Sequence, residues 1–232
     1  MISQKPGRVP RLDFTDPLAQ YVLFCTPCNT GYGNAVTDLS PYRNHGVFVN
    51  TPTWVKGKDG GYALRFAAAS SQGVNFTPSV TDNLFKVSEV TIECRFYPTN
   101  VNSNYRDILR HGDLNVQPYV DYALVQFNDN KLYFSVGITN IIHCATTGTL
   151  SNNTWYHAFG TWDGTTSRIY LNSSTQNNSA SASGSLTGTN NRMPMGYSIQ
   201  WGEYFDGIID FGIIYRKALN ASEIQRRLDY PY

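Results

Sequence analysis

The chain has 232 residues, of which 41% are hydrophobic, 14% aromatic and 15% charged, so we expect one domain or at most two small ones. Lys and Arg number 18 against 17 Asp and Glu, and the net charge of +1 argues against nucleic acid or an anionic membrane surface as a partner. No apolar run approaches the roughly 18 residues of a membrane-spanning helix, so no membrane insertion is expected. The first residues form no secretion signal, so a chain that natively starts at Met1 is expected to be made in a cytoplasm.

The first 12 residues carry Lys5, Arg8 and Arg11 among prolines and a glycine, without a periodic apolar pattern. This composition predicts an extended arm over residues 1–12, ahead of one domain over residues 13–232. Such an arm either frays in solution or grips a neighbouring subunit, and the residues leave both alternatives open.

Four cysteines raise the question of a metal or a disulfide. Cys25 and Cys28 have the spacing of half a zinc site or of a redox pair, but Cys94 and Cys144 have no cysteine near them in the sequence. We expect ordinary, partly buried thiols, with a metal site or a disulfide as the alternatives.

Alternation of apolar and polar residues dominates the chain from residue 19 onward. Residues 91–97 and 131–136 follow this period of two, and clusters of Asn, Asp, Ser and Gly separate such runs. Many short strands with regular turns predict an all-β sandwich of two sheets. The side chains expected to face its core in these two strands are Ile92, Cys94, Phe96, Leu132, Phe134 and Val136.

Residues 172–192 hold few apolar side chains and predict a long polar loop, with a ragged edge strand as the alternative. Residues 207–215 are apolar on both faces, which predicts a central strand covered on each side. Asp210 then lies in a mostly dry setting and needs hydrogen bonds or a cation. The one helix expected spans residues 221–228, because Asn220 and Glu223 form a capping box before it.

Four segments in order carry a family resemblance: residues 38–46, 54–66, 155–172 and 205–224. Together they resemble the laminin G-like, concanavalin A-like jelly-roll family. The resemblance implies a two-sheet antiparallel β-sandwich with a short C-terminal helix. It does not fix the function, because this fold includes lectins, glycan-binding and adhesion modules, hydrolases and virion proteins.

Catalysis is not expected. A glycosidase needs two carboxylates across one bond, about 5–5.5 Å or 6.5–9.5 Å apart, and the hydrolases of this fold place them on one strand in patterns such as E-x-D-x-E. The four glutamates, Glu89, Glu93, Glu203 and Glu223, form no such pattern, and G-x-S-x-G is absent.

The resemblance also implies a structural calcium ion, because oxygen ligands of the kind Ca²⁺ prefers occur at the matching turn and strand. The matching residues are Asp38, Asn44, Asp206 and Asp210. Alternatively, the carboxylates hydrogen-bond their own turns. The chain departs from the family pattern after Phe66, where alanine replaces an expected loop aspartate.

Aromatic rings beside polar groups suit a sugar, which offers apolar ring faces and many hydroxyls. We expect glycan-binding residues at Tyr105, Arg106, Trp201 and Tyr204, with Trp201 at an exposed loop tip. The alternative for Trp201 is a ring folded back on the sandwich edge. The predicted function is a non-catalytic recognition module that binds a glycan or surface polysaccharide or mediates adhesion. The alternative is a structural or decoration subunit of a virus capsid or tail, with other subunits as partners and display on a virion.

Overall fold

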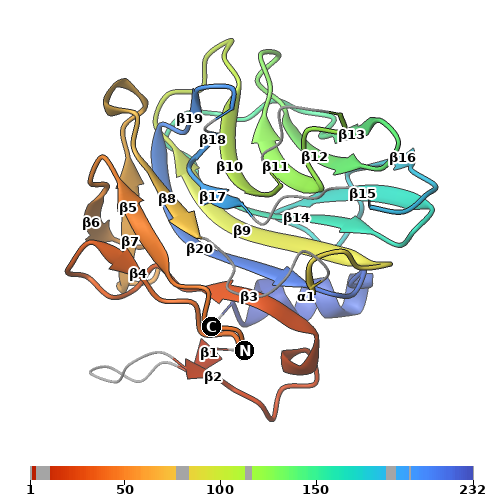
Figure 1. Ribbon diagram of the computed structural model, residues 1–232, viewed down its shortest axis with the longest axis horizontal. Coiled ribbons are helices and arrows are strands. Elements are labelled where there is room, and N and C mark those ends of the chain that lie inside the picture. The colour runs from red at the N-terminus through yellow and green to blue at the C-terminus, as the bar shows by residue number, and fades with distance from the viewer. Residues whose placement is uncertain are drawn as a thin grey trace.

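Two antiparallel sheets stacked face to face make up the fold (Figure 1), as the sequence predicts. The structure is a computed structural model and describes residues 2–3, 11–76, 84–112, 117–186, 192–198 and 200–231. Residues 1 and 4–10 of the predicted arm lie outside the described residues, and whether the arm grips a neighbour stays a prediction. Leu12, at its end, is buried in a cluster of this chain's own side chains.

The first sheet, here called the front sheet, has the strand order β13-β12-β11-β10-β17-β8-β5-β4. Its strands are β4 (Ala35–Val36), β5 (Gly46–Val49), β8 (Gly73–Phe76), β10 (Arg106–His111), β11 (Tyr122–Gln126), β12 (Leu132–Gly137), β13 (Ile141–Ala145) and β17 (Met193–Met195).

The second sheet, here called the back sheet, has the order β16-β15-β14-β9-β20-β7-β6, and β3 also pairs with β20. Its strands are β3 (Val22–Thr26), β6 (Thr53–Lys56), β7 (Tyr62–Phe66), β9 (Val90–Pro98), β14 (Tyr156–Trp162), β15 (Thr166–Leu171), β16 (Asn178–Ser181) and β20 (Gly207–Tyr215).

Short elements complete the chain. The remaining ones are the paired strands β1 (Ile2–Ser3) and β2 (Arg11–Leu12), the paired strands β18 (Tyr197–Ser198) and β19 (Glu203–Tyr204), the 3-10 turns η1 (Ala19–Tyr21) and η2 (Ala68–Ser70), and the helix α1 (Ala221–Asp229). Asn220 and Glu223 form the predicted capping box at the start of α1. The edge strand β16 lies inside the predicted polar loop.

The main core fills the space between the sheets. The six side chains predicted to face it, on β9 and β12, are all buried there. Trp162 is fully buried in the same cluster. The four cysteines are free and buried, as expected for ordinary thiols, and burial raises the pKa of the Cys94 thiol.

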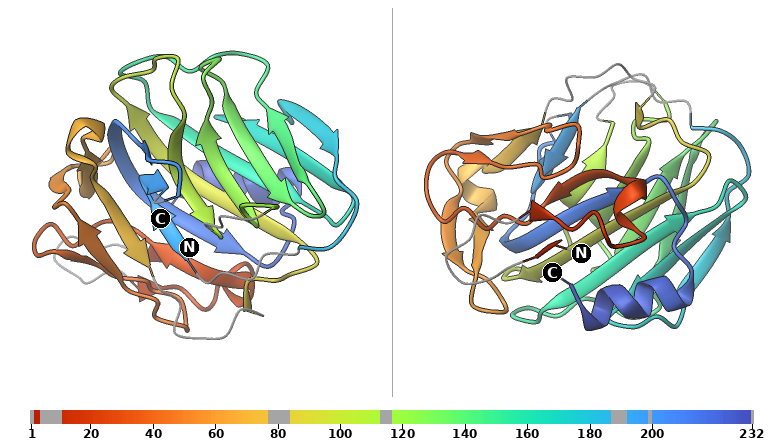
Figure 2. Two further views of the ribbon diagram at one scale, coloured as in Figure 1. Left: turned by 45° about the horizontal axis from the view of Figure 1, so that its top comes forward. Right: turned by 90° about the horizontal axis from the view of Figure 1, so that it is seen from below.

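Strand β20 is central and covered on both faces, as predicted. Ile209 and Ile214 face the main core, whereas Phe211 and Tyr215 join a second cluster on the outer face of the back sheet. Helix α1 covers that outer face through Ile224. Figure 2 shows α1 and the first turns of the chain on this side of the sheet.

A network of buried charges lies on the same outer face. Glu93 of β9 accepts hydrogen bonds from Arg227 of α1 and from the Tyr215 hydroxyl, the latter at 2.7 Å. His157 of β14 lies 2.8 Å from the Glu93 carboxylate. Burial alone would raise the pKa of Glu93, but Arg227 and His157 outweigh it and lower that pKa to about 2. The network therefore ties the helix to the middle of the sheet.

Asp210 meets the requirement that its buried position imposes. Its Oδ2 accepts a hydrogen bond from Arg95 Nε at 2.6 Å, and both side chains are almost fully buried. The Arg95 guanidinium also donates to Asp59 at 2.6 Å and lies 5.2 Å from the centre of the Phe211 ring. This aspartate is part of an ion pair between the two central strands.

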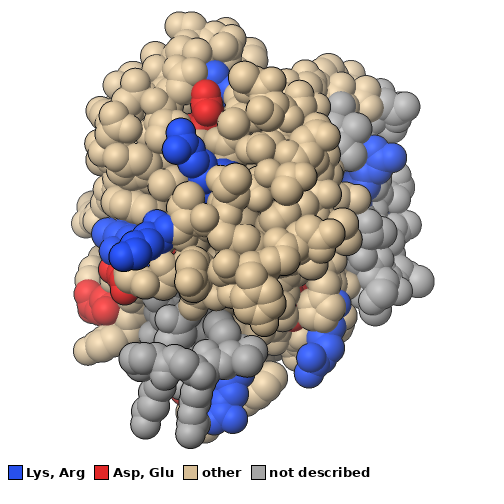
Figure 3. Space-filling model, turned by 90° about the vertical axis from the view of Figure 1, so that its left-hand side faces the viewer, with Lys and Arg blue, Asp and Glu red and all other residues tan. Residues whose placement is uncertain are grey.

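Charge is sparse on one face of the molecule. Figure 3 shows a wide face, on the side of β5 and β6, where Lys, Arg, Asp and Glu are few and scattered. Within the described ranges, no helix combines the length and the apolar composition needed to cross a membrane.

Candidate functional site

A groove on the outer face of the front sheet is the candidate site. Successive side chains of a strand point to opposite faces, so while Tyr122 and Leu124 of β11 face the main core, Ala123 and Val125 face outward. With Val120 they form a small apolar cluster, against which Phe127 and Ile141 pack. Strand β11 is therefore apolar on both faces, and its outer face forms the floor of the groove.

The segment before β11 approaches the end of β12 closely. A Cβ atom at Gly137 would lie 1.7 Å from the carbonyl oxygen of Val120. Only glycine allows this approach, which keeps Val120 at the edge of the floor.

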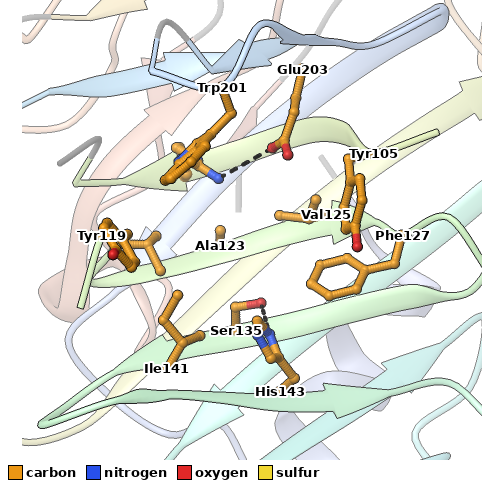
Figure 4. Close-up of a pocket in the computed structure, with 12 residues that line it drawn as sticks. Tyr105, Tyr119, Ala123, Val125, Phe127, Ser135, Ile141, His143, Trp201 and Glu203 are labelled. Atoms are coloured by element: carbon orange, nitrogen blue, oxygen red, sulfur yellow. Dashed lines mark hydrogen bonds and ion pairs between the residues drawn. The ribbon is translucent and has the colours of Figure 1, made fainter. Parts of the chain in front are cut away.

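Aromatic rings surround this floor. The groove has a cavity of about 270 Å³ lined by side chains from β10 to β13 and from the β18–β19 hairpin (Figure 4). Two edge-to-face pairs define it: Tyr119 with Trp201, at 5.4 Å between ring centres, and Tyr105 with Phe127, at 4.9 Å. Edge-to-face contacts stabilise such ring positions. The groove therefore presents fixed apolar surfaces on two sides.

Trp201 sits at the tip of the β18–β19 hairpin. Its backbone N–H donates to the Ser198 hydroxyl at 3.3 Å, and Gly202 adopts the left-handed conformation that the turn requires. The indole is 49% exposed. The residue therefore combines both expected alternatives: it lies at an exposed tip, and its ring also packs back against Tyr119.

A second, polar cavity adjoins the first. It measures about 410 Å³ and is lined by the four predicted glycan-binding residues, Tyr105, Arg106, Trp201 and Tyr204. Tyr105, Trp201 and Glu203 line both cavities, so the two are neighbouring parts of one groove. The sequence-based prediction therefore brought together residues that do share a site. That they bind a glycan stays a prediction.

A charged cluster lies where the two cavities meet. Arg110 of β10 binds Asp107 through two contacts, Nε to Oδ1 at 2.9 Å and a terminal nitrogen to Oδ2 at 2.8 Å. The same guanidinium lies 3.9 Å from Glu203, as the dashed line in Figure 4 marks. Burial raises the pKa of Asp107 well above its ordinary value; the nearby Glu203 adds to the rise, and Arg110 offsets only part of it. Asp107 is fully buried, whereas Glu203 faces the groove.

His143 of β13 adds a polar group to the far side of the groove. Its Nδ1 lies 2.8 Å from the Ser135 hydroxyl. Burial lowers the pKa of this imidazole, so it is neutral near pH 7.

The floor of the groove and the Asp107–Arg110–Glu203 cluster were missed by sequence reasoning. Their members come from strands that pair only in the fold, so no short motif connects them. One signal was present: residues 120–125 alternate so little that both faces of the strand are apolar, as in residues 207–215.

Three of the four residues predicted to bind calcium have partners within the chain, and whether the four hold an ion stays a prediction. Asp38 accepts hydrogen bonds from the backbone N–H groups of Cys25, Ser40 and Asn44, at 2.8–3.0 Å, and from the Ser40 hydroxyl at 2.7 Å. Asp210 pairs with Arg95, and Asp206 accepts from Asn100. No three His, Cys, Asp or Glu side chains among the described residues gather into a metal site. These contacts match the alternative, in which the carboxylates serve their own turns and strands.

Comparison with protein families identifies one match. A model described as the concanavalin A-like lectin/glucanases superfamily matches residues 68–225. A search of curated proteins found no match.

The solved structures similar to this chain include two toxin binding domains and one domain of an arabinanase. The binding domain of Paraclostridial Mosquitocidal Protein 1 has 17% identity and a TM-score of 0.72; the match covers 91% of this chain and 52% of that one, so the chain spans about half its length. A second similar structure is Domain 4 of AbnA, a GH43 extracellular arabinanase from Geobacillus stearothermophilus, in complex with arabinotriose. It has 16% identity and a TM-score of 0.70, and the match covers 89% of this chain and 98% of that one. The binding domain of Botulinum Neurotoxin DC in complex with SialylT has 10% identity and a TM-score of 0.67, and the match covers 91% of this chain and 51% of that one. At these identities the similarity shows the fold.

Proposed function

The chain belongs to the concanavalin A-like lectin/glucanases superfamily, and from that premise we propose that it is a non-catalytic module that binds an oligosaccharide in the groove of the front sheet. One observation carries this proposal: on the outer face of the front sheet, the described residues join an apolar floor, fixed aromatic rings and one carboxylate in a single groove. A pocket that is mostly apolar, with few polar groups to orient the ligand, is typical of binding sites for small molecules.

The chemistry of the groove matches that of a sugar. The C–H face of a pyranose or furanose can lie against Trp201 or Tyr105, and its hydroxyls can reach Glu203 and the polar cavity around Arg106. Because the two cavities adjoin, the groove has room for more than one sugar unit. The complex of the arabinanase domain with arabinotriose supports an oligosaccharide as the class of ligand.

The number of carboxylates that line the groove argues against hydrolysis of a bound glycan. A glycosidase uses one carboxyl group on each side of the bond it cleaves. Among the lining residues that the structure describes, Glu203 is the only carboxylate, since Asp107 is buried behind it against Arg110. The groove therefore has an acceptor for hydroxyls but lacks the second carboxylate of an acid–base pair within these residues.

A single groove of this kind binds weakly, so useful affinity requires many copies on one surface. Adhesion and display on a virus particle are two settings that would supply such copies.

The test is a glycan array probed with a multivalent form of the chain, followed by titration calorimetry with the best glycan and with arabinotriose. Trp201→Ala should weaken binding by about tenfold, since an aromatic contact contributes around 1 kcal/mol beyond its buried area. Tyr32→Ala, which removes an exposed ring far from the groove residues in sequence and outside their cavities, is the matched control. Unchanged binding by Trp201→Ala, or release of new reducing ends from a bound glycan, would contradict the proposal.

A further inference from the structure

Three charged side chains are among the described residues that line the groove. The described lining residues include two cationic groups, Arg106 and Arg110, and one carboxylate, Glu203. His143 is neutral, because burial lowers the pKa of its imidazole. A glycan with a carboxylate or sulfate would need one of the two guanidinium groups as its partner.

Arg110 is already committed to carboxylates of this chain. Asp107 binds it through two nitrogens, at 2.9 and 2.8 Å, and its other terminal nitrogen donates to the Ser198 hydroxyl at 3.2 Å. Its side chain is only 6% exposed. Breaking a buried ion pair is strongly destabilising. An incoming anion would therefore have to displace Asp107 from Arg110 at a large cost in free energy.

Arg106 is committed as well. One terminal nitrogen donates to the backbone carbonyl of Tyr204 at 2.8 Å, and the other donates to the Asn102 amide oxygen at 3.1 Å. Its Nε is buried and has no hydrogen-bond partner among the described residues. The nearby charge of Asp206 raises the pKa of Arg106, although burial lowers it more. The guanidinium thus forms part of the wall, and its free donor is not on the groove surface.

Glu203 is the charged group that a ligand meets. It lines both cavities, and its side chain is 20% exposed, against 1% for Asp107 and 6% for Arg110. A carboxylate accepts hydrogen bonds from sugar hydroxyls, and such charge-assisted bonds are roughly twice as strong as neutral ones. The same charge repels an anionic substituent, more strongly in a partly buried groove than in water.

We propose that the groove selects neutral oligosaccharides over anionic ones and that Glu203 is the residue that sets this preference. The inference rests on the proposed function and deepens it by naming the class of ligand. Glu203 acts twice, as the acceptor for hydroxyls of a neutral sugar and as the charge that excludes a sialylated, sulfated or uronic one.

The experiment compares matched glycans, each in a neutral form and in a sialylated or sulfated form on the same backbone, on an array probed with the multivalent full chain. The wild-type chain should bind the neutral members about tenfold more strongly, because Arg110, 3.9 Å from Glu203 and shared with Asp107, only partly offsets the negative charge near the ligand. Glu203→Gln keeps the shape and one acceptor oxygen but removes the charge. It should raise the ratio of acidic to neutral binding by about tenfold.

Glu89→Gln is the matched control, because Glu89 lies outside the groove and accepts a hydrogen bond from the Ala218 backbone. It should leave the ratio unchanged. Equal or stronger binding of the acidic glycans by the wild-type chain, or an unchanged ratio for a folded Glu203→Gln variant, would overturn the inference while leaving the proposed function intact. Binding of no glycan at all would overturn both.

Discussion

Each outer face of the sandwich carries an apolar cluster, yet among the residues that the structure describes only the cluster on the back sheet is covered by a helix. On the back sheet, helix α1 and the segment of residues 12–19 pack in one cluster with Phe211 and Tyr215. The buried charges of Glu93 and Arg227 are paired there. On the front sheet, β11 presents Ala123 and Val125 to a groove that aromatic rings border but do not fill. A closed apolar face contributes stability, whereas an open one with fixed rings offers a ligand the same gain.

The largest effect should come from breaking the closed face. Arg227→Ala would leave Glu93 as a buried carboxylate without its main counter-charge, and breaking a buried pair in this way costs about 3–5 kcal/mol. Arg65→Ala, which removes an exposed arginine of β7, should cost less than about 0.5 kcal/mol. Urea unfolding of both variants measures the difference. Equal free energies of unfolding would show that α1 is not fastened through this pair.

A smaller effect is expected at the second buried pair. Asp210→Ala should lower the free energy of unfolding by about 1–3 kcal/mol, because Arg95 loses one partner but keeps Asp59. Asp163→Ala is the matched control, since Asp163 serves an exposed turn and its pair with Arg168 is partly solvated. Thermal unfolding would decide the matter, and similar melting temperatures for the two variants would contradict the buried role of Asp210.

Lowering the pH should destabilise the protein through the buried charges on the outer face of the back sheet. The pKa of Glu93 is about 2 in the fold against an ordinary value of 4.5, so its contribution is complete above pH 4.5 and is lost as the pH falls toward 2. Burial also lowers the pKa of His157 below 6.5, so unfolding takes up a proton there too, with the same sign. Denaturant unfolding measured at pH 6.5, 4.5 and 2 should show stability falling, with a shallower fall for Glu93→Gln between 4.5 and 2. An identical fall in both proteins would place the acid sensitivity elsewhere.

The smallest effect should follow metal removal. A bound Ca²⁺ would raise the melting temperature by mass action, but Asp38 and Asp210 are already satisfied by protein donors. EDTA should therefore leave the melting temperature unchanged. A drop that added Ca²⁺ reverses would show that Asp38, Asn44, Asp206 and Asp210 rearrange around an ion.

The fold could be predicted well because each strand and helix follows from a pattern within its own short segment. Alternation placed Ile92 and Phe134 in the core, and the two-sided apolar run at 207–215 identified the central strand. The capping residues Asn220 and Glu223 located the helix within one residue. Each of these signals reflects the immediate surroundings of one segment.

The site was harder to predict, because its parts meet only through pairing of distant strands. Trp201 and Tyr105 were found as exposed loop aromatics, but Asp107, Arg110 and Glu203 come together through the approach of β10 to the β18–β19 hairpin. The calcium ligands were inferred from family resemblance alone. The sequence could not show that the Asp38 carboxylate accepts hydrogen bonds from three backbone N–H groups and from the Ser40 hydroxyl.

The central position of β20 has a consequence for synthesis on the ribosome. This strand pairs with β9 along its length and with β7 and β3 at its two ends, yet 206 residues precede it in the chain. Until Gly207–Tyr215 has left the ribosome, those three strands have unpaired edges, which are prone to pair with other chains. The strand pairing of the back sheet is therefore completed only after β20 has been synthesised. A nascent chain halted before β20 should depend on chaperones to avoid aggregation.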